Sequence, residues 1–435
     1  MKSYYLVASV KWAALLSLLG VALTLLVVSV PASVYEGRIR SAFLDGAVSG
    51  DNYPWYTQGL SYDGFSDCAL LMSLVDRTSF LQDAFRAATY PDENNGSPCG
   101  ALQRKIFTGN PGVKLVRPIR YWNGARVALL PLVVFSYRQV LGCFIILYYL
   151  IPIITCCRLF RVNRRAFYGL LPILTGVVAF SAAPLFAPSI AFVPGMLVTG
   201  LAILGLVLLD NASFKYQMML ACACWAAQLF FEAMLGNLVI ALSIMWAAQI
   251  VLCSVRSHFQ RPMALLGKVS LTGTSFCLGA VSVALTKIVV SAAVVGGLGA
   301  SAAEYTGALT KNMRLDDVSI DSICWLLWGA REELTGDPNS AAALIGLGFA
   351  AWVVVVVLAV WGLLRRNRFL AASAAAFLSA ASPCVLWLLV LRNHVTLHPW
   401  MDIRVISPLI SLALTACWCC WQCCRIDDWD DDPAG

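Results

Sequence analysis

Two carboxylates with helical spacing are the first residues in this sequence that could act as an acid or a base. Asp63 and Asp67 are four residues apart, and an apolar stripe through Leu70, Leu71 and Leu74 continues the same helical face. We expect Asp67 to point toward the bilayer surface along this apolar side of the helix, where partial desolvation suits a general base. The alternative is that Asp67 or Asp63 caps the start of the helix by accepting hydrogen bonds from its free N–H groups.

Histidine and arginine side chains gather between residues 392 and 404. His394, His398 and Asp402 follow at four-residue spacing, which would place metal ligands on one helical face. Pro399 interrupts such a helix after its first turn, so a phosphate site made of charged donors fits better than a divalent metal. A structural loop with neither role is the third interpretation. The residues of the phosphate site would be Arg392, His394, His398 and Arg404.

The elements that position these groups follow from the composition. Sixty per cent of the residues are hydrophobic and only 13% are charged, which excludes an ordinary soluble protein. Because a membrane span needs about 20 apolar residues, we predict an all-α, polytopic membrane protein. The stretch 264–299 is long for one span and could break at Gly296–Gly297. The ten predicted spans are 11–30, 138–157, 167–186, 189–209, 217–232, 235–253, 264–299, 341–364, 369–391 and 403–422.

Charge is unevenly divided between the two sides of these predicted spans. Short loops on one side carry arginine runs at 158–165 and 365–368, whereas most of the 24 acidic residues fall on the other side. This positive-inside pattern, with an even number of spans, predicts that both termini are cytoplasmic. The net charge of +7 then reflects orientation and contact with membrane lipids, and does not indicate nucleic-acid binding.

The predicted topology gives a single membrane domain with outer elaborations. Helices in the first outer loop would lie on the membrane surface. The parts are the membrane domain 1–435, a long first outer loop 31–137, a second outer loop 300–340, and an acidic cytoplasmic tail 425–435.

Most of the 16 cysteines lie in predicted spans, where cysteine behaves as a small apolar residue. Cys68 and Cys99 are exceptions in the first outer loop, and they could form a disulfide in an oxidising compartment. Such a bridge would close a loop of about 30 residues and stabilise it by about 3 kcal/mol.

A basic and aromatic stretch ends the first outer loop. Tyr121 and Trp122 suit the interface between lipid and water. Arg120 and Arg126 could extend to headgroups along their apolar stems, or their guanidinium groups could bind a lipid phosphate.

A first span followed by a long outer loop with surface helices and an early carboxylate resembles the GT-C class of glycosyltransferases. The resemblance implies transfer of a sugar from a polyprenyl-phosphate carrier to a glycan or protein acceptor, on the outer face of the bacterial cytoplasmic membrane. The chain is similar in size to the pilin arabinofuranosyltransferases, which implies arabinofuranose as the sugar. Members often have a soluble carboxyl-terminal domain, whereas here an acidic tail follows the last predicted span.

The resemblance assigns roles to particular residues of this chain. Asp67 or Asp63 would be the catalytic base. The lipid phosphate would be bound by Arg392, His394, His398 and Arg404, together with Arg126 and Arg120. Tyr62, Trp122 and Asn123 would contact the sugar or the acceptor. No cofactor is required by this chemistry, and a divalent metal remains an alternative to the cationic side chains.

Two other functions compete with this interpretation. An oligosaccharide polymerase or ligase would use outer arginine and histidine residues with a lipid-pyrophosphate donor, and would not need Asp63 or Asp67. A transporter would place charges at the bilayer midplane and show paired halves with broken helices. Lys287, deep in the stretch 264–299, is the residue that favours transport.

Overall fold

The computed structural model describes residues 2–51, 64–85, 89–92, 97–117, 124–180, 189–209, 213–231, 236–256, 262–295, 297–312, 338–365, 367–390 and 408–422. The chain is almost entirely helical in these parts, which confirms the predicted all-α class. A single two-residue ladder is the exception among them. It joins β1 (Tyr90–Pro91) to β2 (Leu115–Val116) in antiparallel register, with Tyr90 opposite Val116.

Each predicted span overlaps a helix. Three of these helices contain stretches long and apolar enough to cross a membrane, Val7–Ser29, Tyr137–Val162 and Leu266–Val294, and the others contribute shorter apolar stretches. Several helices thus fit a membrane protein, and the number ten stays a prediction. The helices are α1 (Lys2–Ser29), α6 (Tyr137–Val162), α7 (Arg164–Phe180), α9 (Val193–Leu208), α10 (Phe214–Phe231), α11 (Gly236–Arg256), α12 (Pro262–Val295), α15 (Pro338–Leu364), α16 (Arg368–Val390) and Pro408–Gln422.

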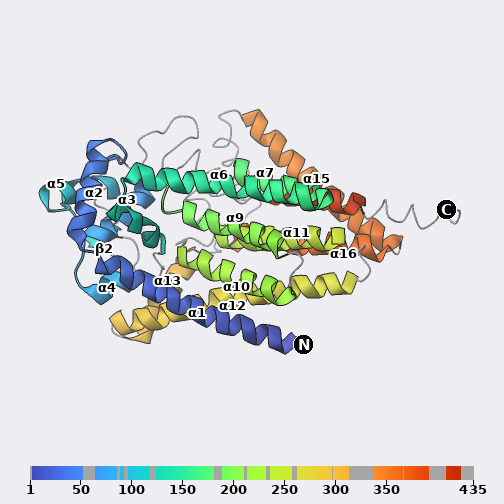
Figure 1. Ribbon diagram of the computed structural model, residues 1–435, viewed down its shortest axis with the longest axis horizontal. Helices are drawn as coiled ribbons and strands as arrows, with labels where there is room; N and C mark the ends of the chain where they lie inside the picture. The colour runs from blue at the N-terminus through green and yellow to red at the C-terminus, as the bar shows by residue number, and fades with distance from the viewer. Residues whose placement is uncertain are drawn as a thin grey trace.

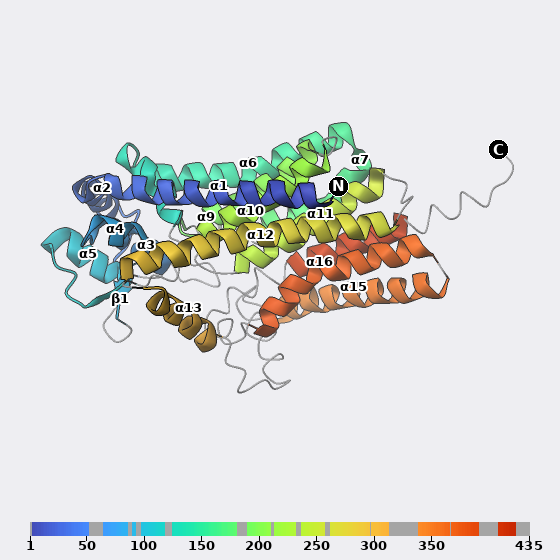
Figure 2. The same ribbon diagram turned by 90° about the horizontal axis from the view of Figure 1, so that it is seen from below.

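Most of these helices run side by side and form the bundle (Figures 1 and 2). Shorter elements gather at one end of it, where α1 ends and α6 begins. We call this group the platform. It consists of α2 (Ala32–Leu44), α3 (Gly64–Val75), α4 (Phe80–Phe85), α5 (Pro98–Thr108), the 3-10 helix η1 (Gly124–Val133), β1 and β2.

Local sequence signals set the limits of the platform helices. Ser97 caps α5 by accepting a hydrogen bond from the Gly100 backbone N–H at 3.2 Å, and Pro98 occupies the first helical position. Gly109 ends α5 with φ of 79°, a left-handed conformation in which a side chain is strained. A capping box of Ser136 and Gln139 starts α6, so this long helix begins at the rim of the platform.

The basic turns lie at the end of the bundle remote from the platform. Asn163 alone connects α6 to α7, and the α15–α16 connection around Arg365 lies at the same end (Figures 1 and 2). The start of α1 lies there too. The predicted separation of basic loops from the first outer loop therefore corresponds to two ends of one bundle.

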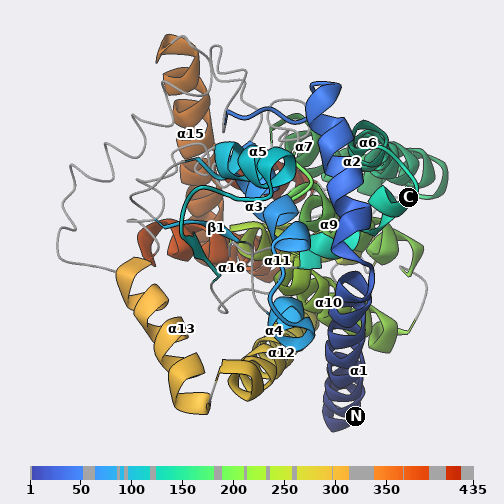
Figure 3. The same ribbon diagram turned by 90° about the vertical axis from the view of Figure 1, so that its left-hand side faces the viewer.

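Most of the long stretch 264–299 belongs to one continuous helix, α12, which ends at Val295. Gly297 has φ of 136°, and α13 (Leu298–Asn312) starts immediately after it in a new direction (Figure 3). The predicted break at Gly296–Gly297 is confirmed at Gly297. Figure 3 also shows α15 standing apart from most of the bundle, with α16 as its packing neighbour.

The two parts have separate cores. In the bundle, the largest buried cluster includes Ile173, Ile244 and Phe377 from α7, α11 and α16. In the platform, Leu71 and Leu102 from α3 and α5 pack together with other buried side chains. Two hydrophobic cores of this kind allow the platform to hold its own geometry at the end of the bundle.

Candidate functional site

The junction between the platform and the bundle contains the predicted site residues that the structure describes. These are Asp67 on α3 and Arg126 on η1. The other predicted residues lie outside the described residues: Tyr62, Asp63, Arg120, Trp122, Asn123, Arg392, His394, His398 and Arg404.

Asp67 lies in the interior and is 1% exposed. Its carboxylate accepts hydrogen bonds from the Ser189 hydroxyl at 2.6 Å, the Ile190 N–H at 3.1 Å and the Ala191 N–H at 3.0 Å. The Tyr137 hydroxyl donates a fourth. The expectation that Asp67 points toward the bilayer surface is therefore wrong, because the segment before α9 covers that face of α3.

These bonds define the role of Asp67 within the fold. Asp67 lies in the first turn of α3, and the backbone N–H groups of residues 190 and 191, before α9, donate to its carboxylate. The alternative expectation, that Asp67 or Asp63 caps the start of the helix, stays a prediction. Asp67 joins three elements: α3, the start of α6 through Tyr137, and the segment leading into α9. A carboxylate that accepts four hydrogen bonds has its lone pairs engaged and is poorly placed to take a proton from a substrate.

Arg126 is also buried, with 1% of its surface exposed. Its two terminal nitrogens donate to the backbone carbonyls of Asp83 at 2.7 Å and Ala84 at 2.9 Å, which are the last turn of α4. The interpretation that Arg126 extends to lipid headgroups is therefore wrong. Burial lowers the pKa of Arg126 to about 10, so the group remains protonated at neutral pH.

Lys287 of α12 reaches the same point. Its side chain is 1% exposed and its ammonium donates to the Phe85 carbonyl at the end of α4. Lys287 is seven residues from the carboxyl end of the apolar stretch Leu266–Val294, so it lies about 10 Å from the middle of that stretch at 1.5 Å per residue. Lys287, the residue that favoured a transporter, therefore caps the carboxyl end of α4 in the platform.

Arg77 is a third cation with this function, and no pattern along the chain singles it out. Its Nε donates to the Leu74 carbonyl at 2.8 Å and Nη1 donates to the carbonyls of Val28 and Val30 at 2.8 and 2.6 Å. Arg77 therefore caps both α3 and α1. The carboxyl end of a helix carries a partial negative charge, which offsets a buried cation.

A buried tyrosine lies beside these arginines. The guanidinium carbon of Arg77 is 5.8 Å from the centroid of the Tyr35 ring, and Tyr35 is fully buried. Burial raises the pKa of Tyr35, and the positive charges of Arg77 and Arg126 act in the opposite direction. Burial likewise lowers the pKa of Arg77. The phenol is therefore neutral at physiological pH and packs as an amphipathic ring.

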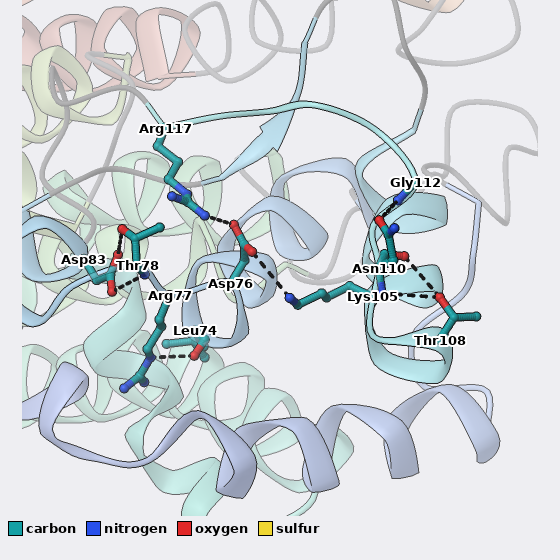
Figure 4. A network of polar contacts seen from close by, with 10 residues as sticks. All are labelled: Leu74, Asp76, Arg77, Thr78, Asp83, Lys105, Thr108, Asn110, Gly112 and Arg117. Carbon is teal, nitrogen blue, oxygen red and sulfur yellow. Dashed lines mark hydrogen bonds and ion pairs between the residues drawn. The ribbon is translucent and has the colours of Figure 1, made fainter.

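Two further carboxylates, Asp76 and Asp83, connect segments of the platform, as Figure 4 shows. Asp83 accepts hydrogen bonds from the backbone N–H of Thr78 at 2.9 Å and its hydroxyl at 3.1 Å, and so caps α4. Asp76 pairs with Arg117 and, at 3.6 Å, with Lys105, so one carboxylate ties α3 to α5 and to the end of β2.

The disulfide between Cys68 and Cys99 is present and joins α3 to α5. The predicted pairing is confirmed. Cys68 follows Asp67 directly, so the bridge fixes the same turn of α3 that holds the segment 189–191. Among the cysteines that the structure describes, Cys143 and Cys157 of α6 are exposed thiols outside this bridge.

The junction is therefore a rigid polar framework that positions neighbouring residues. Asp63 precedes α3 by one residue and Arg120 to Asn123 precede η1, so the framework fixes the ends from which these residues extend. Among the described residues, no cluster of histidine, cysteine, aspartate or glutamate could hold a metal ion.

Asp67 and Arg126 stand out in the sequence because each is a charged residue next to apolar residues. Both side chains are buried in the structure. The sequence pattern could not identify their partners, because these are backbone carbonyls and amides supplied by other elements. No protein-family model matches this sequence, and no curated protein or solved structure matches it either.

Proposed function

We propose that this protein is a multi-pass membrane glycosyltransferase of the GT-C type. It would take a sugar, with arabinofuranose as the specific candidate, from a polyprenyl-phosphate donor and pass it to a glycan or protein acceptor. The bundle would cross the bacterial cytoplasmic membrane ten times, and the platform would lie on the outer face. The observation that carries this proposal is a disulfide-linked helical platform at the end of the apolar bundle opposite its basic turns.

The disulfide supports an outer position for the platform, because such bridges persist in oxidising compartments. The exposed arginines of the α6–α7 turn lie at the remote end, as expected for a cytoplasmic side. Both termini would then be cytoplasmic. The platform would contact lipid headgroups and the water outside the cytoplasm. A lipid-linked sugar and its acceptor could both reach this position.

The predicted phosphate site would also face the platform side. The α15–α16 turn lies at the remote end, so α16 runs back toward the platform and ends at Val390. The segment 391–407, with Arg392, His394, His398 and Arg404, connects that end to the helix starting at Pro408. Cationic donors in this segment would bind the carrier phosphate.

Asp63 is the stronger candidate for the base. Asp67 is engaged by four donors, and Asp63 lies one residue before the helix that Asp67 and the disulfide fix in place. The base would remove the proton of the acceptor hydroxyl as its oxygen attacks the anomeric carbon. The bond from that carbon to the phosphate oxygen would break, and the arginine and histidine donors would stabilise the departing phosphate.

Transport is the less favoured alternative. Its main support was a lysine near the bilayer midplane, and Lys287 instead caps α4 at the platform. A polymerase or ligase with a lipid-pyrophosphate donor would use the same arginine and histidine segment, and it differs from our proposal in having no need for Asp63.

The proposal can be tested by carrier-lipid binding and sugar transfer with the full-length protein in mild detergent. Native mass spectrometry would measure retention of added decaprenyl phosphate by wild type, His394→Ala/Arg404→Ala and Asp63→Asn. A matched control is His258→Ala/Arg261→Ala, which removes the same residue types from the predicted opposite side of the membrane.

We expect Asp63→Asn and the control variant to retain the lipid and His394→Ala/Arg404→Ala to lose it. With decaprenyl-phosphate-linked arabinose as donor, Asp63→Asn should lose transfer by a factor of about 100 or more. Absence of lipid from every sample, even after addition, would contradict the transferase. Full transfer by Asp63→Asn, with loss in the double variant, would contradict the role of Asp63 as the base. Transfer from a lipid-pyrophosphate-linked oligosaccharide, with none from decaprenyl-phosphate-linked arabinose, would favour the polymerase or ligase.

A further inference from the structure

The α6–α7 turn forms an exposed basic surface with a fixed geometry. Asn163 connects the two helices and accepts a hydrogen bond from the Ala166 N–H at 3.0 Å, so it also caps α7. Leu159 and Ala166 on either side are 2% and 0% exposed, which fixes the turn against the bundle. The arginines that project from it are all exposed: Arg158, Arg161, Arg164 and Arg165.

Aromatic rings lie directly beside these charges. Phe167 contacts both Phe160 and Tyr168 edge to face, with ring centroids 5.4 and 5.3 Å apart. The guanidinium carbon of Arg164 lies 4.9 Å from the centroid of Phe160, which orients that arginine. Phe160 and Tyr168 are 44% and 53% exposed, so the surface presents apolar rings as well as cations.

The described part of the chain supplies no acidic partner for these arginines. Its four ion pairs all involve Asp45, Asp76 or Asp92, at the platform end. The arginines of the turn are therefore available to a ligand. Exposed rings next to uncompensated guanidinium groups fit the boundary between acyl chains and headgroups, where aromatic residues are enriched and anionic lipids attract basic groups.

We propose that the α6–α7 turn is a binding site for the headgroups of anionic phospholipids. The guanidinium groups bind the phosphate, since their planar fork matches two phosphate oxygens. Phe160 and Tyr168 contact the glycerol and upper acyl region. The site lies at the end of the bundle remote from the platform, and it does not depend on glycosyl transfer.

The test is lipid binding by the full-length protein in detergent, titrated with phosphatidylglycerol or phosphatidylcholine and followed by native mass spectrometry. The variant is Arg161→Gln/Arg165→Gln, which leaves the Arg164–Phe160 contact in place. The control is Arg104→Gln/Lys114→Gln, which removes two exposed cations from the platform end.

We expect phosphatidylglycerol affinity to fall about 25-fold in the variant, about fivefold for each arginine, and to stay at the wild-type level in the control. Binding by wild type should also weaken as NaCl is raised. Equal affinity in the variant and the control would overturn the proposal. The proposal would also be overturned if wild type bound phosphatidylcholine as tightly as phosphatidylglycerol, or if binding did not respond to salt. Both of these results come from wild type alone and do not depend on the folding of a variant.

Discussion

The platform and the bundle are stabilised by different kinds of interaction. In the platform, a disulfide joins α3 to α5, Asp76 pairs with two cations, and Arg77 caps two helix ends. In the bundle, helices approach closely at small residues, as at Gly279, where an added Cβ would lie 2.3 Å from the Cys222 carbonyl oxygen. Hydroxyl pairs between helices add to this, such as the partly buried Ser17 and Ser282 at 3.0 Å.

The difference fits the two surroundings that we propose. Helices in lipid gain little from hydrophobic burial against one another, so close packing and hydrogen bonds between hydroxyl groups hold them together. A small unit at the membrane surface has a limited core, to which a covalent link and helix caps add stability. The buried cations at α4 join the two parts, because Arg126 comes from the platform and Lys287 from the bundle.

The largest effect should come from the carboxylate that joins the two regions. Asp67→Asn replaces a charged acceptor with an amide whose NH2 group would face the donors of Ser189 to Ala191. We expect a loss of about 4 kcal/mol in the free energy of unfolding, measured by titration with SDS in mixed micelles. Hydrogen exchange of the segment before α9 should increase.

Asp76→Asn is the matched control, since it makes the same change immediately after the same helix. The side chains of Asp76 and its partners Lys105 and Arg117 are partly exposed to solvent, at 12%, 23% and 17%, so its loss should reach only about 2 kcal/mol. Equal losses for the two variants would show that Asp67 is not the link between the regions.

The disulfide should give the second-largest effect, confined to the platform. Cys68→Ala/Cys99→Ala is expected to cost about 3 kcal/mol and to speed proteolysis between α3 and α5. Limited proteolysis with mass mapping would measure it. Cys143→Ala/Cys157→Ala removes two exposed free thiols of α6 as a control and should leave the pattern unchanged. Cleavage that begins within the bundle would contradict the division between the regions.

Close packing in the bundle should give the next effect. Gly279→Ala places a Cβ against the backbone of α10, which cannot move as a flexible side chain would, so we expect a loss of about 2 kcal/mol. Gly267→Ala on the same helix has open space around the added carbon and should stabilise by about 0.5 kcal/mol. The two variants can be compared by their midpoints of thermal unfolding in detergent. Equal shifts of the midpoint in the two variants would argue against close packing at Gly279.

The smallest effect should come from a hydroxyl pair. Ser17→Ala removes the hydrogen bond to Ser282 and should cost about 0.6 kcal/mol in the same SDS titration. A loss above about 2 kcal/mol would mean that polar contacts contribute to the bundle as strongly as they do to the platform.

Much of the fold could be predicted from local patterns along the chain. Apolar stretches gave the positions of the long helices, Gly297 ended α12 near the expected point, and the Cys68–Cys99 pairing was anticipated from the location of the two cysteines. The candidate site was less accessible. Periodicity placed Asp67 on an apolar face but could not show whether lipid or protein covers that face, because the covering segment lies more than 120 residues further along.

The sequence by itself determined the helical class, the separation of basic turns from the acidic first outer loop, and the disulfide, since each depends on composition or on neighbours along the chain. Only the tertiary structure decided what the buried charges do. Asp67 binds the segment before α9, and Arg77, Arg126 and Lys287 cap helix ends, because the carbonyls and amides that satisfy them come from elements distant in sequence. Residue type indicates that a buried charge needs a partner, and only the packing of the chain supplies it.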